Sequence, residues 1–282
     1  MLSLPRGRIL DLTIPHVMGI LNVTPDSFSD GGQHNEVDSA VKRALTMLEQ
    51  GATIIDIGGE STRPGASDVL EQEELARVIP VIKALRKQSD CVISIDTSKA
   101  AVMTAAVHAG ADIINDVRAL QEPGALQAAV AADIPVCLMH MKGQPRSMQT
   151  APHYDDVTSQ VCEFLEHRAN QCIEAGIKPE HIMIDPGFGF GKSLQHNYQL
   201  LAQLDKLQNL GYPILTGLSR KSMFGQLLNR PADERLSASL AGALICLQKG
   251  AVILRVHDVQ QTVDVVRVHE ATCNPLQTQP AV

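Results

Sequence analysis

VISIDTSKAAVMTAAVHAGADIINDV, residues 92–117, contains the pattern that decides the fold. A largely β-branched run at 92–97 is followed by an alanine-rich helical stretch at 100–109 and by a second apolar run at 112–117. Gly110 stands just before the second run, where a glycine commonly ends a helix. Nearly continuous apolar strands that alternate with helices predict a parallel sheet covered on its outer face.

The same strand–helix unit recurs along the whole chain. Strands are expected at 17–22, 53–58, 92–97, 112–117, 135–140, 182–186, 214–218 and 252–257. Helices are expected at 37–50, 71–88, 100–109, 124–131, 155–175, 197–207, 232–249 and 259–272. Open doubly wound sheets usually have about five or six strands, whereas eight units close a barrel. The sequence therefore predicts an α/β fold of the (β/α)8 TIM barrel type.

The domain organisation follows from the length. Barrels of roughly 250 residues are single domains, so residues 1–282 are expected to form one domain with its core at about 17–272. The segment GRILDLTIP at 7–15 alternates weakly, which predicts a short strand or hairpin that closes the bottom of the barrel. The polar, proline-bearing segment NPLQTQPAV at 274–282 predicts a frayed tail.

Composition excludes several classes of function. The net charge of −7 argues against nucleic acid as a partner, because nucleic-acid-binding surfaces are usually basic. No apolar run reaches the ~18 residues of a membrane helix, so neither membrane insertion nor export is expected. The six cysteines are scattered and form no C-x-x-C pair. They predict reduced thiols in a cytoplasmic protein.

Polar side chains gather where the predicted strands end. They are Asn22, Asp56, Asp96, Asn115, Asp116, Asp185, Ser219, Arg255 and His257. The carboxyl ends of barrel strands form one rim, and TIM-barrel enzymes keep their chemistry there. Because strand side chains alternate between faces, Ser94 and Asp96 share one face, while Ile95 suits the helix-packing side. A strand-end Asp can simply cap a helix, but crowding so many unpaired polar groups on one rim would cost several kcal/mol without a ligand.

The type of each rim residue indicates a ligand chemistry. Asp96, Asn115 and Asp185 offer acceptors and one amide, which suits a flat heterocycle with several N–H donors. Arg255 and His257, two residues apart, can bind phosphate oxygens, and Lys221 supplies a further cation. The usual phosphate site of these barrels lies near strands seven and eight, which agrees with that placement. We therefore expect an anionic substrate that carries a diphosphate.

The polar loops beside the rim also point to a ligand. The loops at 22–32 and 58–66, which carry Phe28 and Arg63, are candidates for mobile lids. The stretch GFGFGKS at 187–193 is one residue short of a phosphate-binding P-loop. Its glycines instead indicate a loop whose backbone approaches a ligand. His140 could line the site, although a packed histidine is the favoured interpretation.

These segments together resemble the dihydropteroate synthases, the pterin-binding barrel enzymes of the folate pathway. The resemblance covers residues 17–272. It is carried by MGILNVTPDSFSDGG at 18–32, DIGGESTRPGA at 56–66, ISIDTSK at 93–99, IINDVR at 113–118, MHMKG at 139–143, DPGFGFGK at 185–192, LSRKSMFG at 218–225 and LRVHDV at 254–259. The first two are long and highly specific, and no position with an assigned role departs from the pattern.

The resemblance implies a transferase that joins p-aminobenzoate to 6-hydroxymethyl-7,8-dihydropterin diphosphate, with Mg2+ assisting, and releases dihydropteroate and pyrophosphate. It also implies a homodimer and a sulfonamide target. The resemblance assigns the pterin to Asp96, Asn115, Asp185 and Lys221, and it assigns the diphosphate to Asn22, Thr62, Arg255 and His257. It assigns Mg2+ to Asn22. It assigns p-aminobenzoate to Phe28, Pro64, Phe190, Lys221 and Ser222. Catalysis would rest on Arg255, His257, Lys221 and Arg63.

Three alternatives stay open on the sequence alone. A methyltetrahydrofolate-dependent methyltransferase would use the pterin site without the diphosphate residues or the two loop motifs. A non-catalytic pterin-binding paralogue would be expected to lose Arg63, Lys221 or His257, and all three are present. A sugar-phosphate barrel enzyme would explain the phosphate site but not the cluster of Asp96, Asn115 and Asp185.

Overall fold

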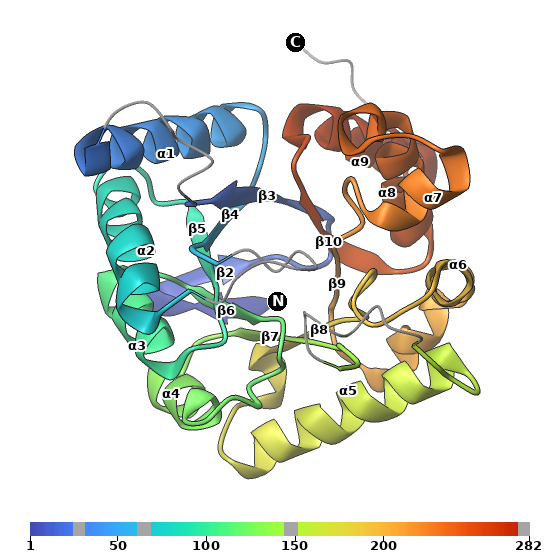
Figure 1. Ribbon diagram of the computed structural model, residues 1–282, viewed down its shortest axis with the longest axis horizontal. Coiled ribbons are helices and arrows are strands. Elements are labelled where there is room, and N and C mark those ends of the chain that lie inside the picture. The colour runs from blue at the N-terminus through green and yellow to red at the C-terminus, as the bar shows by residue number, and fades with distance from the viewer. Residues whose placement is uncertain (25–31, 61–68, 144–151, 276–282) are drawn as a thin grey trace.

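Eight parallel strands close into a barrel in the computed structural model, which describes residues 1–24, 32–60, 69–143 and 152–275 (Figure 1). The strands are β3 (His16–Asn22), β4 (Ile54–Gly58), β5 (Val92–Asp96), β6 (Ile113–Asp116), β7 (Val136–Met139), β8 (Ile182–Asp185), β9 (Ile214–Thr216) and β10 (Ala251–Val256). Pairing of β10 with β3 closes the ring. The predicted (β/α)8 fold is confirmed.

Helices cover the outside of the ring (Figure 1). They are α1 (Gly32–Glu49), α2 (Glu71–Arg86), α3 (Ala100–Ala109), α4 (Ala125–Ala132), α5 (Val157–Glu174), α6 (Leu194–Ala202), α7 (Ser222–Leu228), α8 (Leu236–Gln248) and α9 (Val259–Cys273). The helix expected at 197–207 is α6 followed by a 3-10 segment at Leu204–Leu210, and no glycine or proline marks that break. Helix α7 was not predicted, because it is short and has Gly225 at its centre.

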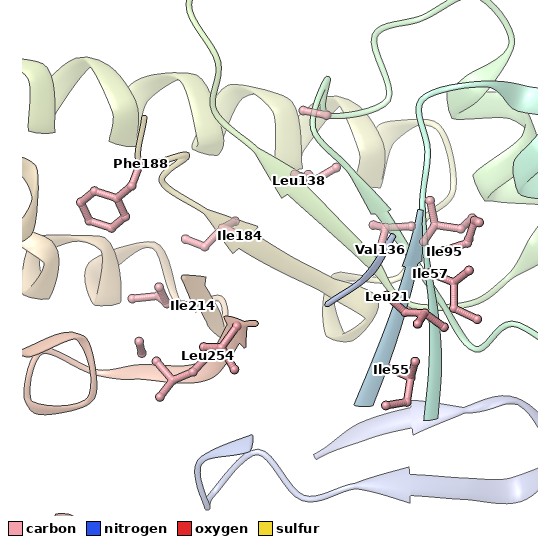
Figure 2. Close-up of a cluster of buried hydrophobic side chains, with 14 of the residues drawn as sticks. Leu21, Ile55, Ile57, Ile95, Val136, Leu138, Ile184, Phe188, Ile214 and Leu254 are labelled. Carbon is pink, nitrogen blue, oxygen red and sulfur yellow. The ribbon is translucent and has the colours of Figure 1, made fainter. Parts of the chain in front are cut away.

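Side-chain alternation along each strand sorts the residues between the barrel interior and the helices. Ile57, Ile95 and Ile114 belong to the large outer cluster beneath the helices, together with other strand residues shown in Figure 2. Burial of each such side chain stabilises the fold by about 1.5–3 kcal/mol. The predicted division, with Ile95 on the helix side and Asp96 on the interior side, is confirmed.

An antiparallel hairpin closes the amino-terminal end of the barrel. Strands β1 (Leu2–Leu4) and β2 (Arg8–Leu10) are joined by a 3-10 turn, and their leucines pack on the first interior side chains of the barrel strands. Those interior residues are Met18, Ile54, Ile113, Cys137, Met183, Leu215 and Ile253. The predicted hairpin is confirmed in kind, but it lies at 2–10 rather than 7–15. Three-residue strands are too short to give a clear alternating pattern.

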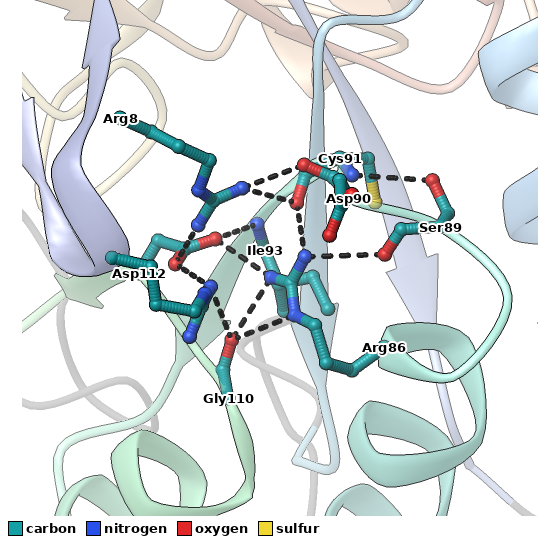
Figure 3. A network of polar contacts seen from close by, with 9 residues as sticks. Arg8, Arg86, Ser89, Asp90, Cys91, Ile93, Gly110 and Asp112 are labelled. Atoms are coloured by element: carbon teal, nitrogen blue, oxygen red, sulfur yellow. Dashed lines mark hydrogen bonds and ion pairs between the residues drawn. The ribbon is translucent and has the colours of Figure 1, made fainter.

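Asp112 ties this hairpin to the barrel (Figure 3). Its fully buried carboxylate pairs with the guanidinium groups of Arg6 and Arg8 from the hairpin and of Arg86 from the end of α2. It also accepts a hydrogen bond of 2.9 Å from the backbone N–H of Ile93 at the start of β5. One carboxylate therefore joins the hairpin, a helix end and two adjacent strands.

The carboxyl-terminal helix α9 ends at Cys273, and Asn274 provides its last backbone contact, an N–H bond to Glu270. Most of the tail expected to fray, 276–282, lies outside the described residues, and the single-domain extent also stays a prediction. None of the helices in the described part of the chain is long and apolar enough to cross a membrane.

Candidate active site

The barrel interior becomes polar above its apolar amino-terminal layer. Two residues beyond Ile54, Ile113 and Ile253, the alternation brings Asp56, Asn115 and Arg255 to the inner face. Their contacts confirm this placement, because they join strands that are not neighbours in the ring. Contacts between non-adjacent strands can form only across the interior, so these side chains converge at the carboxyl ends of the strands.

Arg255 lies at the centre of this convergence. Its Nε donates to Asp56 Oδ2 at 2.6 Å, and its Nη2 donates to Asp96 Oδ2 at 2.7 Å. Asn115 Nδ2 donates to the same Asp56 oxygen at 3.2 Å. The second oxygen of Asp56 is buried without a hydrogen-bond partner among the described residues. Such an orphaned acceptor is costly unless a ligand N–H reaches it.

Burial and mutual charge set the protonation of the cluster. Burial raises the pKa of Asp96 to about 7, although Arg255 opposes the shift. Burial also raises the pKa of Asp185. It lowers the pKa of Lys221 to about 8, and the positive charge of Arg255 adds to that effect. Burial alone would lower the pKa of Arg255, but Asp56 and Asp96 raise it, so this guanidinium stays charged.

Asp185 and Lys221 join the cluster from the opposite wall. Asp185 Oδ1 accepts a hydrogen bond of 2.7 Å from the N–H of Gly187, and the charge of Lys221 acts on this carboxylate. Lys221 immediately precedes α7, and its Nζ lies 4.1 Å from the centre of the Phe190 ring. An ammonium at this distance forms a cation–π contact. The structure thus brings together Asp96, Asn115, Asp185, Lys221 and Arg255, as predicted from the strand ends.

The remaining described residues with predicted roles lie at the same rim. His257 follows β10, and its Nδ1 is 3.0 Å from Ser219 Oγ, which also accepts from the His257 N–H at 3.2 Å. Asn22 ends β3, and Ser222 begins α7. Phe28, Thr62, Arg63 and Pro64 lie outside the described residues, so the structure does not place them.

The glycines after β8 allow two loops of the chain to lie in close contact. A side chain at Gly187 would lie 1.9 Å from the carbonyl oxygen of His140, and one at Gly191 would lie 2.2 Å from that of Lys142. Both glycines also have positive φ values. These two glycines therefore allow a close backbone approach to the loop after β7 of the same chain, and the approach of this loop to a ligand stays a prediction.

Comparisons with known proteins show the family of the chain. The model of the family described as pterin binding enzymes matches residues 18–257, which is most of the chain. The chain belongs to the pterin-binding enzyme family. Within that family it is similar to the dihydropteroate synthase of Haemophilus influenzae, with 59% identity over 268 residues, which cover 95% of this chain and 98% of the relative.

Two solved structures of dihydropteroate synthases extend the similarity to the fold. The Yersinia pestis enzyme with a sulfonamide drug has a TM-score of 0.91 and 58% identity, and the match covers 95% of this chain and 98% of that one. The Xanthomonas albilineans enzyme in complex with 7,8-dihydropteroate has a TM-score of 0.86 and 50% identity, with coverage of 97% and 98%. The resemblance to dihydropteroate synthases drawn from the motifs is confirmed.

Two residues at the carboxyl end of the barrel had no role predicted from the sequence. Asp56 holds both Arg255 and Asn115, and its signal was a lone carboxylate on the inner face of an otherwise apolar strand. Lys192 is almost completely buried beside His140. A lysine after a glycine-rich stretch normally indicates an exposed loop, so this burial had no sequence signal.

Among the described residues, Asn22 is the candidate ligand for a metal ion. No three His, Cys, Asp or Glu side chains among them are grouped so as to hold a metal ion. Asn22 supplies one amide oxygen at the rim, on the inner face of β3 two residues beyond Ile20. Mg2+ typically binds one or two protein oxygens together with substrate phosphates and water, so this residue fits a metal held mainly by a diphosphate.

Proposed function

We infer that this chain catalyses the dihydropteroate synthase reaction and is a transferase of folate biosynthesis. The observation that carries this inference is the group of Asp96, Asn115 and Asp185 beside the cations of Lys221 and Arg255. This combination suits a neutral heterocycle with N–H donors joined to an anionic leaving group. The similarity to dihydropteroate synthases over nearly the full length of the chain supports it.

We assign the pterin to the lower part of the site. Asp96, Asn115 and Asp185 would accept from and donate to its polar edge, and Lys221 would hydrogen-bond its carbonyl oxygen. Asp56 Oδ1 suits a ligand N–H group, because it has no hydrogen-bond partner among the described residues. Asp185 suits another, because its carboxylate accepts one N–H, from Gly187, and has capacity for further donors. Each such bond to a charged group stabilises binding by about 1.5–3 kcal/mol.

We assign the diphosphate to Arg255, His257, Asn22 and Thr62. Two of the five N–H groups of Arg255 donate to Asp56 and Asp96, which orients the guanidinium and leaves donors for phosphate oxygens. Mg2+ held by Asn22 and the diphosphate would neutralise part of the charge on the leaving group. The p-aminobenzoate site, where sulfonamides would compete, would be formed by Phe28, Pro64, Phe190, Lys221 and Ser222. Thr62 and Arg63 would close over the substrate.

The chemistry needs little help from a general base. The bond from the pterin methylene carbon to the diphosphate oxygen breaks, and its electron pair leaves with pyrophosphate. The amine nitrogen of p-aminobenzoate then bonds to that carbon and loses a proton to water. Arg255 and His257 stabilise the charge that grows on the leaving group, and such electrostatic stabilisation commonly contributes most to the rate in sites of this kind. The displacement is therefore proposed to be dissociative.

The direct test is an assay of the purified chain. It is incubated with the pterin diphosphate, Mg2+ and labelled p-aminobenzoate, and labelled dihydropteroate is sought by chromatography. Product that depends on both substrates is expected, and its loss on chelation with EDTA would support the metal. No product from folded protein that contains Mg2+ would overturn the proposed function.

Arg255→Gln tests the role of the cation. This change removes the charge that faces the diphosphate, and the loss of one electrostatic donor of this kind costs about 10²–10³ in turnover. We expect kcat for dihydropteroate formation to fall by that order. Unchanged kcat together with a raised KM for p-aminobenzoate alone would show that Arg255 belongs to the other substrate site.

The assembly and the compartment are part of the same proposal. The described residues include exposed Leu227 and Leu228 of α7, Ile245 of α8 and Val268 of α9, which lie on neighbouring helices on one side of the barrel (Figure 1). A homodimer that covers this side is proposed. All six cysteines are free thiols, which supports the reducing cytoplasm as the compartment.

A further inference from the structure

Lys192 is a buried lysine that no step of the proposed reaction uses. It lies between the loop 187–191 and Ser193, the residue that caps α6, and only 2% of it is exposed. Lysine is almost never fully buried unless its ammonium is satisfied by nearby acceptors. The acceptors around its ammonium should therefore explain why a lysine is buried here.

The ammonium of Lys192 is surrounded by acceptors from two loops. Its Nζ donates to the carbonyl oxygens of Gly187 at 2.8 Å and Phe190 at 3.1 Å. It also lies 2.9 Å from His140 Nδ1 and 3.4 Å from the His140 carbonyl oxygen. An ammonium has three N–H donors, and these contacts use all of them. Lys192 thus fastens the loop after β8 to the loop after β7.

The charge environment agrees with a structural use of the ammonium. The direct partners are neutral, and Asp185 is the nearby carboxylate that favours the charged form. Burial, however, lowers the pKa of Lys192 to about 7. Its neighbour His140 is held neutral, because burial and then Lys192 lower its pKa to about 2. A neutral imidazole can accept from the ammonium, whereas a protonated one could not.

Phe190 depends on this fastening more than Asp185 does. Asp185 is part of β8 and is held in register with Met139 of β7, so the barrel positions its backbone, and the turn contributes one N–H, from Gly187, to its carboxylate. Phe190 lies in the loop, where its N–H donates to Gly187 at 3.1 Å and its carbonyl oxygen accepts from Lys192. The ring of this buried residue faces the Lys221 ammonium. Lys192 therefore fixes both ends of the turn that carries the aromatic ring.

We propose that Lys192 is a positioning residue for the p-aminobenzoate site, which it serves by holding the turn 187–190 so that Phe190 forms a wall of that site. The assignment of this site to p-aminobenzoate rests on the proposed function. Lys192 itself touches neither substrate. We expect the larger effect on p-aminobenzoate, because the barrel fixes the backbone of Asp185 and only its link to Gly187 passes through the turn.

The test compares Lys192→Met with Lys142→Met. Methionine keeps most of the length of the stem and removes all three donors, while Lys142 is an exposed lysine of the neighbouring loop. Lys192→Met is expected to raise the KM for p-aminobenzoate by up to about tenfold, which is the size of the effect expected when one aromatic contact is lost. The affinity for an unreactive hydroxymethylpterin, measured by calorimetry, and kcat should both change far less than this KM. Lys142→Met should leave all three unchanged.

A second variant covers the case in which Lys192→Met does not fold. His140→Leu removes one acceptor and leaves the carbonyl contacts of Lys192, so a smaller rise of the same KM is expected. Parallel losses of pterin affinity and kcat in either variant would indicate general structural damage and would overturn the proposal. An unchanged KM for p-aminobenzoate in folded Lys192→Met would do the same.

A measurement independent of activity separates this proposal from the proposed function. The chain has five phenylalanines, so fluorophenylalanine labelling gives a 19F spectrum simple enough to assign Phe190 through Phe190→Tyr. In Lys192→Met the Phe190 signal should shift or broaden, while that of Phe224, a buried residue of α7, stays in place. An unmoved Phe190 signal would overturn the positioning role even in an active enzyme. A displaced signal would support it even if no dihydropteroate forms.

Discussion

His140 shows how strongly burial controls a single residue of this barrel. A packed histidine was the favoured interpretation of the sequence, and the ring does pack edge-on against Phe164 at 5.0 Å between ring centres. Burial, with a further contribution from the Lys192 charge, lowers its pKa from 6.5 to about 2. Below pH 6.5 the unfolded chain therefore binds a proton at His140, whereas the folded protein leaves this ring neutral down to about pH 2.

His140→Asn should consequently change how stability depends on pH. Below pH 6.5 the unfolded wild-type chain binds one proton more at this position, so the wild type loses stability as the pH falls toward 2. The loss approaches about 1.4 kcal/mol per pH unit, and Asn removes it. The free-energy difference between wild type and variant, from urea unfolding at pH 7 and pH 5, should shift in favour of the variant at pH 5. A constant difference would show that His140 is not held neutral.

Single residues also show where sequence reasoning about the site reaches its limit. Asp96, Asn115, Asp185 and Arg255 were found because strand alternation and strand ends place them without knowledge of any loop. Lys192 was missed because its burial depends on how two loops fold against each other, and loop packing leaves no periodic signal. The glycines at 187 and 191 were noticed, but their partner, the loop after β7, could be identified only from the structure.

At the scale of elements, the amino-terminal hairpin depends on one buried charge. Its strands have three residues each, and its main polar anchors are the Arg6 and Arg8 contacts with Asp112. Strand and helix periodicity predicted the barrel because each unit repeats the same pattern over many residues. The hairpin bounds and α7 escaped prediction because tertiary contacts, rather than local pattern, determine such short elements.

Asp112→Asn should therefore lower the free energy of unfolding strongly, although it changes only one atom of the side chain from oxygen to nitrogen. The change keeps the volume but leaves Arg6, Arg8 and Arg86 around an uncharged amide. Removing one partner of a buried ionic cluster costs about 3–5 kcal/mol, and the lower end is expected because Arg6 is 44% exposed. Urea unfolding should show this loss. Asp205→Asn, which breaks an exposed pair with Lys249, is the control and should cost far less. Equal losses would contradict the anchoring role.

At the scale of the whole molecule, the two ends of the barrel have separate tasks. The amino-terminal end is plugged by the hairpin leucines and fixed by the Asp112 contacts, and it contains no residue with a proposed chemical role. The carboxyl end carries Asp56, Asp96 and Arg255 together. This division is typical of TIM barrels, in which loops and strand ends can vary while the opposite end preserves stability. Changes at Asp112 should thus reach activity only through unfolding.

The proposed homodimer rests on exposed apolar side chains of three helices on the outer surface of the barrel. Leu228 and Val268 are 46% and 64% exposed on α7 and α9, and Ile245 lies on α8, which packs against α9. Exposed apolar side chains gathered on adjacent helices are typical of a protein interface, whereas single ones are ordinary.

The double change Leu228→Asp and Val268→Asp should lower the mass measured by light scattering from that of two chains toward one, because it buries charge in the contact. Ile9→Asp, which alters a similarly exposed side chain on the hairpin, should leave the mass unchanged. A wild-type protein that already measures as a single chain, or a double variant that keeps the mass of two, would place the interface elsewhere or remove it.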